Sequence, residues 1–391
     1  MTREVLIPNA RVPFWRNQRV LRAVAQVVVA AAVLFLLYVL WFNVTNNMRA
    51  RGVRTDFNFL DQPFGVRIAG SDLSPSAPVR SALLNGIRNT FALAIVGLPL
   101  LTILGVIVGV GRLSTNWLVA KISSAYVEIL RNLPPLLVVI FAFQAVILRL
   151  PPARNPITPF GWFVISNLEF HVPGFRAGDN YRPFMMVMLV AVLLGALLWW
   201  WRTRVHERTG TPHHRWLWSL GTIGLVGAIA YLILDRPLTI ILPRLEGRVV
   251  DGGYRGLGAF FAVVGALAFY TSSHVAEIVR GSILAVPKGQ SEAASALALS
   301  GFQRLRFVVL PQAMRIALPP IINQYLNYVK NTSLAIAVGF AEVTLVAFQA
   351  IGNGQPAPQV VVLLMGSYLI FSLVISLLVN LYNRHLRIVT R

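Results

Sequence analysis

The residues of this chain that could bind a polar solute lie inside a stretch that is otherwise apolar. A helix expected over residues 321–348 carries amide and charged side chains on one stripe: Asn323, Asn327, Lys330 and Asn331, with Gln324 and Glu342 at its edge. Lys330 would lie about 13–14 Å into this helix, near the bilayer midplane, where transport sites are found. The stripe predicts either a path for a solute or hydrogen bonds that join subunits, and the sequence leaves both open.

A second group of polar residues lies near the inner end of an apolar stretch at 124–148. Glu128 and Arg131 are three residues apart, close enough to pair on one helical face. Pro134 and Pro135 follow them and remove backbone donors, which predicts a loosened helix, as a fixed kink or as a hinge, with the kink favoured. An unpaired charge in hydrocarbon costs at least about 2.5–3.5 kcal/mol, so Lys330 is a candidate counter-ion for Glu128 or Glu342.

The motifs of common enzyme chemistry are absent from the sequence. It contains no G-x-x-x-x-G-K-[ST] loop to hold a nucleotide, no G-x-S-x-G and no H-E-x-x-H. With no Cys, thiolate metal sites and disulfides are excluded, and the six His residues form no pair at ligand spacing. We therefore expect no catalytic residue, no metal and no cofactor.

The elements that position these side chains are membrane-spanning helices. The 391 residues are 56% hydrophobic and 13% charged, which is typical of a polytopic membrane protein. Apolar runs long enough to cross roughly 30 Å of hydrocarbon are expected at 23–43, 89–111, 124–148, 184–201, 216–235, 257–279, 321–348 and 359–382. The predicted fold class is all-α with about eight transmembrane helices. Gly105 and Gly109, four residues apart, predict a face for close helix contact.

The net charge of +21 does not indicate nucleic-acid binding, because the basic residues are scattered over short loops between apolar runs. Their distribution follows the positive-inside rule and places both termini and the loop at 287–320 in the cytoplasm. The Pro- and Gly-rich stretches 44–80, 149–183 and 236–256 would then lie outside. They could contact an external binding protein or simply connect helices.

Residues 287–320 form the longest polar interruption between two apolar runs in the second half of the chain. Their composition predicts a short helix over 291–299, with Ser291 as its N-cap, Glu292 in its first turn and Gly301 as its stop. Apolar residues then alternate with Gln303, Arg304 and Arg306, which gives an amphipathic surface open to an acidic partner. On composition alone, a helix that lies on the membrane surface is favoured.

The spacing within this loop resembles the EAA loop of ABC-type import permeases, the cytoplasmic segment that docks onto the ATP-hydrolysing subunit. The residues that carry the resemblance and the expected docking are Glu292, Ala293, Ala294, Gly301, Arg304, Leu310 and Pro311. Ala298 stands where the family usually has the Gly of a sharp turn, and Val308 where it has Ile. We expect the turn to shift to Gly301.

Two further segments resemble the same family. Lys330-Asn331-Thr332-Ser333-Leu334 is similar to the K-D-T-S-L signature of amino-acid permeases, with Asn331 in place of the usual Asp. Residues 131–135 are similar to an R-G-T-P segment. The polar residues within the apolar spans, together with this resemblance, predict a substrate path that includes Asn323, Asn327, Lys330, Asn331, Thr332, Ser333, Glu128 and Arg131.

The layout is most similar to the larger permease subunit of general L-amino-acid ABC importers. Residues 81–148 and 257–391 would form the two parts of a five-helix permease core, with an anchor helix and outer loop at 1–80 and an inserted helix pair at 149–256. The resemblance implies a bacterial inner-membrane permease that alternates access for L-amino acids. Its partners would be a second homologous permease, two ATP-binding subunits and a periplasmic substrate-binding protein. The alternative is a secondary transporter or channel without an ATPase.

Overall fold

The computed structural model describes residues 18–52, 55–210, 214–247 and 249–386, and helices dominate it. Seven helices are long and apolar enough to cross a membrane, and a bent helix pair supplies an eighth crossing if it counts as one. The unbroken long helices are α1 (Gln18–Ala50), α2 (Val79–Gly111), α5 (Tyr181–Thr209), α6 (Arg215–Ile233), α7 (Gly258–Leu284), α10 (Leu310–Asn331) and α12 (Ala357–Leu386). The predicted all-α polytopic fold is confirmed.

The span expected at 124–148 is a broken one. Helix α3 (Trp117–Arg131) meets the segment formed by α4 (Pro135–Phe141) and the π-helical turn η3 (Ala142–Ile147) at 106°. Asn132 ends α3, Pro134 has an extended backbone, and Pro135 begins α4, where a missing backbone donor does no harm. The proline pair therefore produces the kink that the sequence favoured.

The span expected at 321–348 is not a single helix. Helix α10 begins at Leu310, continues as the 3₁₀ segment η6 (Thr332–Val338), and ends at Gly339, whose φ of 70° is left-handed. A separate short helix, α11 (Val343–Gly352), follows with Glu342 as its N-cap. Lys330 thus lies in the last turn of a helix that starts eleven residues earlier than expected.

The core is built where α2 packs along α7. A Cβ on Gly105 would lie 2.5 Å from Val275 Cγ1, and one on Gly109 would lie 2.7 Å from the Ala276 carbonyl oxygen. These approaches leave no room for a side chain, so the small-residue face predicted for this helix is confirmed. Tyr328 of α10 completes the contact, since it is fully buried and donates a hydrogen bond to the Leu93 carbonyl at 3.1 Å.

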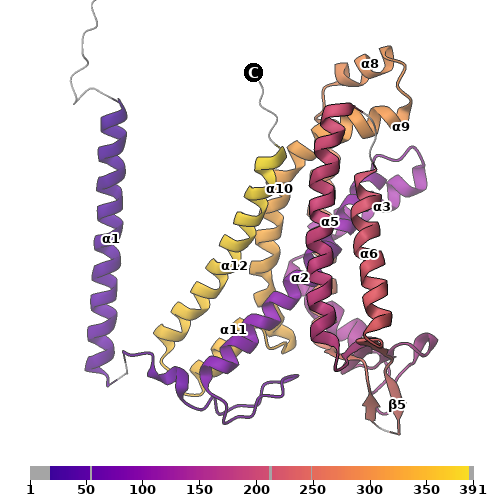
Figure 1. Ribbon diagram of the computed structural model, residues 1–391. Coiled ribbons are helices and arrows are strands. Elements are labelled where there is room, and N and C mark those ends of the chain that lie inside the picture. Colours follow the sequence, from indigo (N-terminus) through magenta and orange to yellow (C-terminus); the bar gives the residue numbers. More distant parts are fainter. Residues whose placement is uncertain (1–17, 53–54, 211–213, 248, 387–391) are drawn as a thin grey trace, which may run out of the picture.

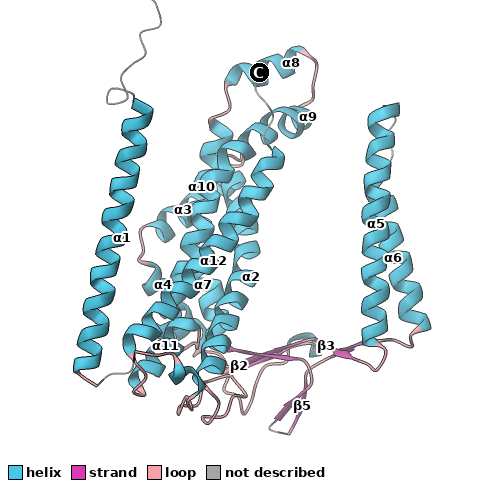
Figure 2. Ribbon diagram, turned by 60° about the vertical axis from the view of Figure 1, so that its left-hand side comes forward, coloured by secondary structure: helices cyan, strands magenta, loops and turns pink. Residues whose placement is uncertain are grey.

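The two ends of the bundle differ in structure (Figures 1 and 2). The short helices α8 (Lys288–Ala296) and α9 (Gly301–Arg304) lie at one end, together with the start of α1 and the end of α12. Residues 1–17 and 387–391, which include both termini, lie outside the described residues.

The labelled strands lie at the opposite end (Figure 2). There β2 (Glu169–Val172) pairs antiparallel with β1 (Val164–Ile165) and β7 (Tyr254–Leu257). Strand β3 (Gly174–Ala177) pairs with β4 (Leu238–Ile241), and β5 (Arg244–Glu246) with β6 (Val249–Asp251). The outer stretches are therefore partly ordered as small sheets. Helices α5 and α6 rise from β3 and β4 as a hairpin that stands apart from the bundle (Figure 2).

Candidate functional site

The loop that joins α7 to α10, residues 285–309, projects from the end of the bundle as two short helices (Figure 1). We call it the α8–α9 loop. Helix α8 starts at Lys288 after Pro287, with no side-chain cap. The expected Ser291 N-cap is therefore wrong, and Glu292 lies in the second turn, where the helix dipole gives it little support. Sequence reasoning placed this start too late because Gly289 disfavours a helix interior and Ser291 is of a type common at N-caps.

The turn between α8 and α9 lies at Ala298 and does not shift to Gly301. Ala298 has a φ of 55°, in the left-handed region that favours glycine. Gly301 is instead the first residue of α9, where Ser300 is the N-cap and exchanges hydrogen bonds with Gln303 in a capping box. The backbone keeps its turn at the position of the usual Gly although the residue has changed.

The α8–α9 loop is held together by side-chain contacts that leave its outer surface free. Arg304 donates a hydrogen bond to Ser295 Oγ at 2.9 Å, which ties α9 to α8. Gln312 of α10 donates to Gln290 Oε1 at 3.2 Å. Ala294 is buried, whereas Glu292 is exposed. Arg304 is therefore committed within the loop, and Glu292 offers its charge outward.

The loop passes into α10 without a break. The π-helical turn η5 (Leu305–Val309) continues directly from α9 to Leu310, the first residue of α10. Pro311 follows within the first turn, where its missing backbone donor is tolerated. Helix α9, η5 and α10 therefore follow one another without an intervening loop.

Three of the four residues of the stripe on α10 (Asn323, Asn327, Lys330 and Asn331) are exposed, and Asn331 is half-buried. Within the described residues, none of their side chains has a hydrogen bond or an ion pair to the rest of the chain. The opposite side of α10 packs on α2, where Thr102 Oγ1 and Tyr325 Oη lie 2.7 Å apart. The α10 stripe thus faces away from the core of its own subunit.

Thr332 and Ser333 begin η6, directly after α10, and lie off the stripe. Thr332 is buried and donates to the Val329 carbonyl at 2.7 Å, and Ser333 donates to the Lys330 carbonyl at 2.9 Å. Their hydroxyl groups satisfy carbonyls of the last helical turn.

Glu342 does not lie at the edge of the stripe, as the sequence suggested. It is fully buried, and its carboxylate accepts hydrogen bonds from Thr344 N at 2.8 Å, Leu345 N at 3.0 Å and Tyr368 Oη at 2.9 Å. The break after η6 moves it away from α10. Glu342 therefore joins α11 to α12, and the suggested ion pair with Lys330 does not form.

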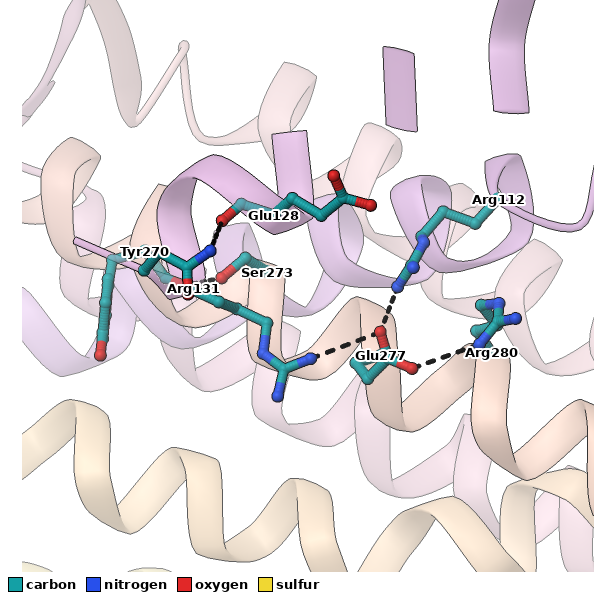
Figure 3. Close-up of polar contacts among 8 residues, drawn as sticks. Arg112, Glu128, Arg131, Tyr270, Ser273, Glu277 and Arg280 are labelled. Atoms are coloured by element: carbon teal, nitrogen blue, oxygen red, sulfur yellow. Dashed lines mark hydrogen bonds and ion pairs between the residues drawn. The ribbon is translucent and has the colours of Figure 1, made fainter. Parts of the chain in front are cut away.

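The expected pair of Glu128 with Arg131 also does not form. Glu128 is exposed, and its carbonyl accepts a hydrogen bond from the Asn132 side chain at 2.8 Å. Arg131 points instead to Glu277 of α7, with Nη1 3.5 Å from Oε2 (Figure 3). The bend after Asn132 turns the end of α3 toward α7, so a partner from another helix replaces the neighbour in sequence.

Glu277 holds three arginines, which we call the Glu277 cluster: Glu277, Arg112, Arg131 and Arg280 (Figure 3). Arg112 at the end of α2 donates to Oε2, and Arg280 Nη1 lies 3.3 Å from Oε1. The cluster joins the ends of α2, α3 and α7 a short distance before the α8–α9 loop. Sequence reasoning missed it, although an acidic residue inside the expected span 257–279 with an arginine three positions later was a detectable signal.

Among the described residues, no group of three or more His, Asp or Glu could hold a metal ion. The candidate functional features of the described residues are the projecting α8–α9 loop, the unpartnered α10 stripe and the Glu277 cluster at the helix ends.

Comparison with known proteins shows which family this chain is similar to. Residues 101–388 match the family described as "Binding-protein-dependent transport system inner membrane component". The chain is 35% identical to the "Putative amino-acid ABC transporter permease protein YhdX" of Escherichia coli, over 94% of each chain. It is 36% identical to the "General L-amino acid transport system permease protein AapQ" of Rhizobium johnstonii, over 89% of this chain and 88% of that protein. It is 32% identical to the "Glutamate/glutamine/aspartate/asparagine transport system permease protein BztB" of Rhodobacter capsulatus, over 93% of each.

The left-handed turn at Ala298 predicts that Ala298→Gly stabilises the α8–α9 loop. Relief of the Cβ clash is worth about 1–2 kcal/mol, offset by about 0.4–1 kcal/mol for the greater freedom of glycine in the unfolded chain. Amide hydrogen exchange over residues 288–304 should slow. Ala293→Gly, within α8, is the matched control. It should destabilise the helix by about 1 kcal/mol and therefore speed exchange. Faster exchange in Ala298→Gly would contradict the turn assignment.

The Glu277 cluster predicts that Glu277→Gln destabilises the chain, because three arginines are left without their carboxylate. We expect a loss of about 1–2 kcal/mol, reduced from the value of a buried pair because the groups are partly solvent-exposed. A lower melting temperature of the purified protein would show it. Glu128→Gln removes the same charge from an exposed, unpaired site and should leave the melting temperature unchanged. Equal effects of the two substitutions would refute the cluster.

Proposed function

Because the chain belongs to the family of binding-protein-dependent transport system inner membrane components, we propose that it is a permease subunit of an ATP-driven importer of L-amino acids. The relatives named above are transport-system permeases for amino acids, and each aligns with nearly the whole chain. The seven or eight candidate crossings and the lack of nucleotide-binding motifs in the sequence agree with a subunit that moves solute while another hydrolyses ATP.

The observation that carries the proposal is the α8–α9 loop. It projects from the bundle at the end opposite the strands and presents the exposed Glu292. It also continues through η5 into α10, the helix that carries the polar stripe. We infer that an ATP-binding subunit docks here, and that closure of a pair of such subunits moves α10. On this proposal, the loop and both termini are cytoplasmic, and the strands face the periplasm and a substrate-binding protein.

The α10 stripe supports a second permease subunit and a shared path. Amide and ammonium groups within a membrane need partners, and those of Asn323, Asn327 and Lys330 have none among the described residues of their own chain. A homologous permease packed against this face would enclose the stripe. The carboxylate and ammonium groups of an amino acid would then bind to its amides and to Lys330. With Asn331 in place of an Asp, the path carries one negative charge fewer, which bears on the range of substrates.

The docking proposal predicts that Glu292→Lys lowers ATP-dependent amino-acid uptake at least about tenfold. The reversed charge should weaken contact with the ATP-binding subunit by about 1.4 kcal/mol or more. Uptake is measured in vesicles with internal ATP and no ion gradient, together with co-purification of the ATP-binding subunit. Glu207→Lys makes the same exposed charge change at the end of α5, on the hairpin that stands apart from the bundle, and should leave both unchanged. Normal uptake and co-purification in Glu292→Lys would place the docking surface elsewhere. Uptake that requires an ion gradient and no ATP would show a secondary transporter.

The path proposal predicts that Asn327→Leu lowers uptake about fivefold or more while the complex stays assembled. The change keeps similar bulk and removes one or two hydrogen bonds to the solute. Asn327→Gln retains the amide and should recover part of the activity. If the stripe serves subunit contact alone, Asn327→Leu should instead reduce the yield of intact complex in detergent. Unchanged uptake and unchanged yield would exclude both roles.

A further inference from the structure

The hairpin formed by α5 and α6 carries an unusual concentration of tryptophan at one end. Five of the nine Trp residues of the chain lie between residues 199 and 218: Trp199, Trp200, Trp201, Trp216 and Trp218. The last turns of α5 and the first turn of α6 place them together, at the same end of the molecule as the α8–α9 loop (Figure 1). Trp199 and Trp216 are in contact edge to face, with ring centroids 4.2 Å apart.

Arginines are stacked on these rings. The Arg202 guanidinium lies 4.5 Å from the Trp218 ring centroid and 5.4 Å from that of Trp201. Arg204 lies 4.0 Å from Trp200, and Arg215 lies 5.0 Å from Trp199. We call these five tryptophans and three arginines the Trp–Arg end. Stacking on aromatic faces holds the planar guanidinium groups in place. Arg215 Nη1 also donates to Thr203 Oγ1 at 3.5 Å.

The charge of the Trp–Arg end is not balanced by the protein. Between residues 196 and 225 the sequence has four arginines and one carboxylate, Glu207. Within the part of the chain that the structure describes, Arg202, Arg204 and Arg215 form no ion pair. Arg202 Nε is buried and has no acceptor there. The site therefore has donors in fixed positions, a positive charge and no anion.

We propose that the Trp–Arg end binds the phosphate of an anionic phospholipid headgroup, with Arg202, Arg204 and Arg215 as donors. The α5–α6 hairpin stands apart from the bundle, and its Trp200, Trp201 and Trp218 are each more than half exposed. Tryptophans with this exposure belong at the level of lipid headgroups, and basic residues between helices at that level attract anionic lipids. The inference rests on the proposed function only for the orientation that assigns this end to the cytoplasmic leaflet.

A lipid fits the site better than a soluble anion or a protein. Apolar side chains such as Leu193, Leu197 and Leu220 are exposed next to the Trp–Arg end, where acyl chains would cover them. A free phosphate would leave this surface uncovered, and a protein partner would need carboxylates matched to three guanidinium groups. A phospholipid supplies both the anion and the apolar chains in one molecule.

The test measures lipid adducts of the purified full-length chain by native mass spectrometry, in titrations with phosphatidylglycerol and with phosphatidylcholine. Wild type should bind the first phosphatidylglycerol far more tightly than phosphatidylcholine, and excess inorganic phosphate should not displace it. The double variant Arg202→Gln/Arg204→Gln should bind phosphatidylglycerol about 25-fold more weakly, at about fivefold for each arginine. The matched control Arg182→Gln/Arg236→Gln removes two exposed charges from the opposite end of the same hairpin and should bind like wild type.

Several outcomes would overturn the proposal. Equal binding of the two lipids by wild type would show that the site makes only apolar contacts with lipid. This comparison does not depend on the folding of any variant. Displacement of phosphatidylglycerol by inorganic phosphate at similar concentration would identify a soluble-anion site. If the double variant binds phosphatidylglycerol as tightly as wild type, these arginines do not bind the headgroup. Because the ATP-binding subunit is absent from this measurement, failure here is distinguishable from failure of the docking proposal.

Discussion

Every polar group within a membrane must find a partner other than water or lipid, and this constraint explains most of the architecture. The chain meets it internally at two contacts between helices, where buried polar side chains are hydrogen-bonded within the chain. Glu342 is surrounded by backbone and hydroxyl donors, and Tyr328 reaches the Leu93 carbonyl across the contact of α10 with α2. Unpaired groups of this kind cost several kcal/mol, so these contacts fix how the helices lie against one another.

The α10 stripe is the exception to this rule, and it supports the proposal that a second subunit packs here. Asn323, Asn327 and Lys330 are exposed on a helix whose other side is well packed. A chain that satisfies a buried carboxylate so completely would be expected to satisfy these groups also. Under the proposed function, a second subunit or a solute would supply their partners. The same helix begins in the α8–α9 loop, so one continuous element joins the proposed docking surface to the proposed path.

Hydropathy was sufficient to predict six of the eight spans, because each one is a local property of about twenty residues. The spans expected at 124–148 and 321–348 are interrupted in the structure. The prolines after Arg131 were sufficient to predict a kink, since they remove donors from their own helix. What the sequence did not reveal depends on contacts between distant segments. Arg131 was assigned to Glu128, three residues away, whereas the 106° bend turns it toward Glu277 on another helix. Glu342 was placed on the stripe by counting residues through a helix that ends at Asn331. The turn at Ala298 shows the reverse case, where the loop geometry persists although the residue that best suits it is absent.

The Glu277 cluster and the inserted hairpin lead to the same physical question, which is how charge at helix ends is compensated. In the cluster, one carboxylate serves three arginines that come from three helices, so the ends of α2, α3 and α7 are joined just before the α8–α9 loop. At the Trp–Arg end the arginines are held by aromatic faces, and no carboxylate of the described residues pairs with them. Protein charges fix the position of the core helices relative to each other. The α5–α6 hairpin is joined to the bundle through the strands at its other end, and its described residues show no such ion pair at this end. If the Trp–Arg end binds lipid as proposed, the hairpin would follow the lipid while the core changes conformation. Anchoring in the membrane would then be separate from the movement that the proposed transport requires.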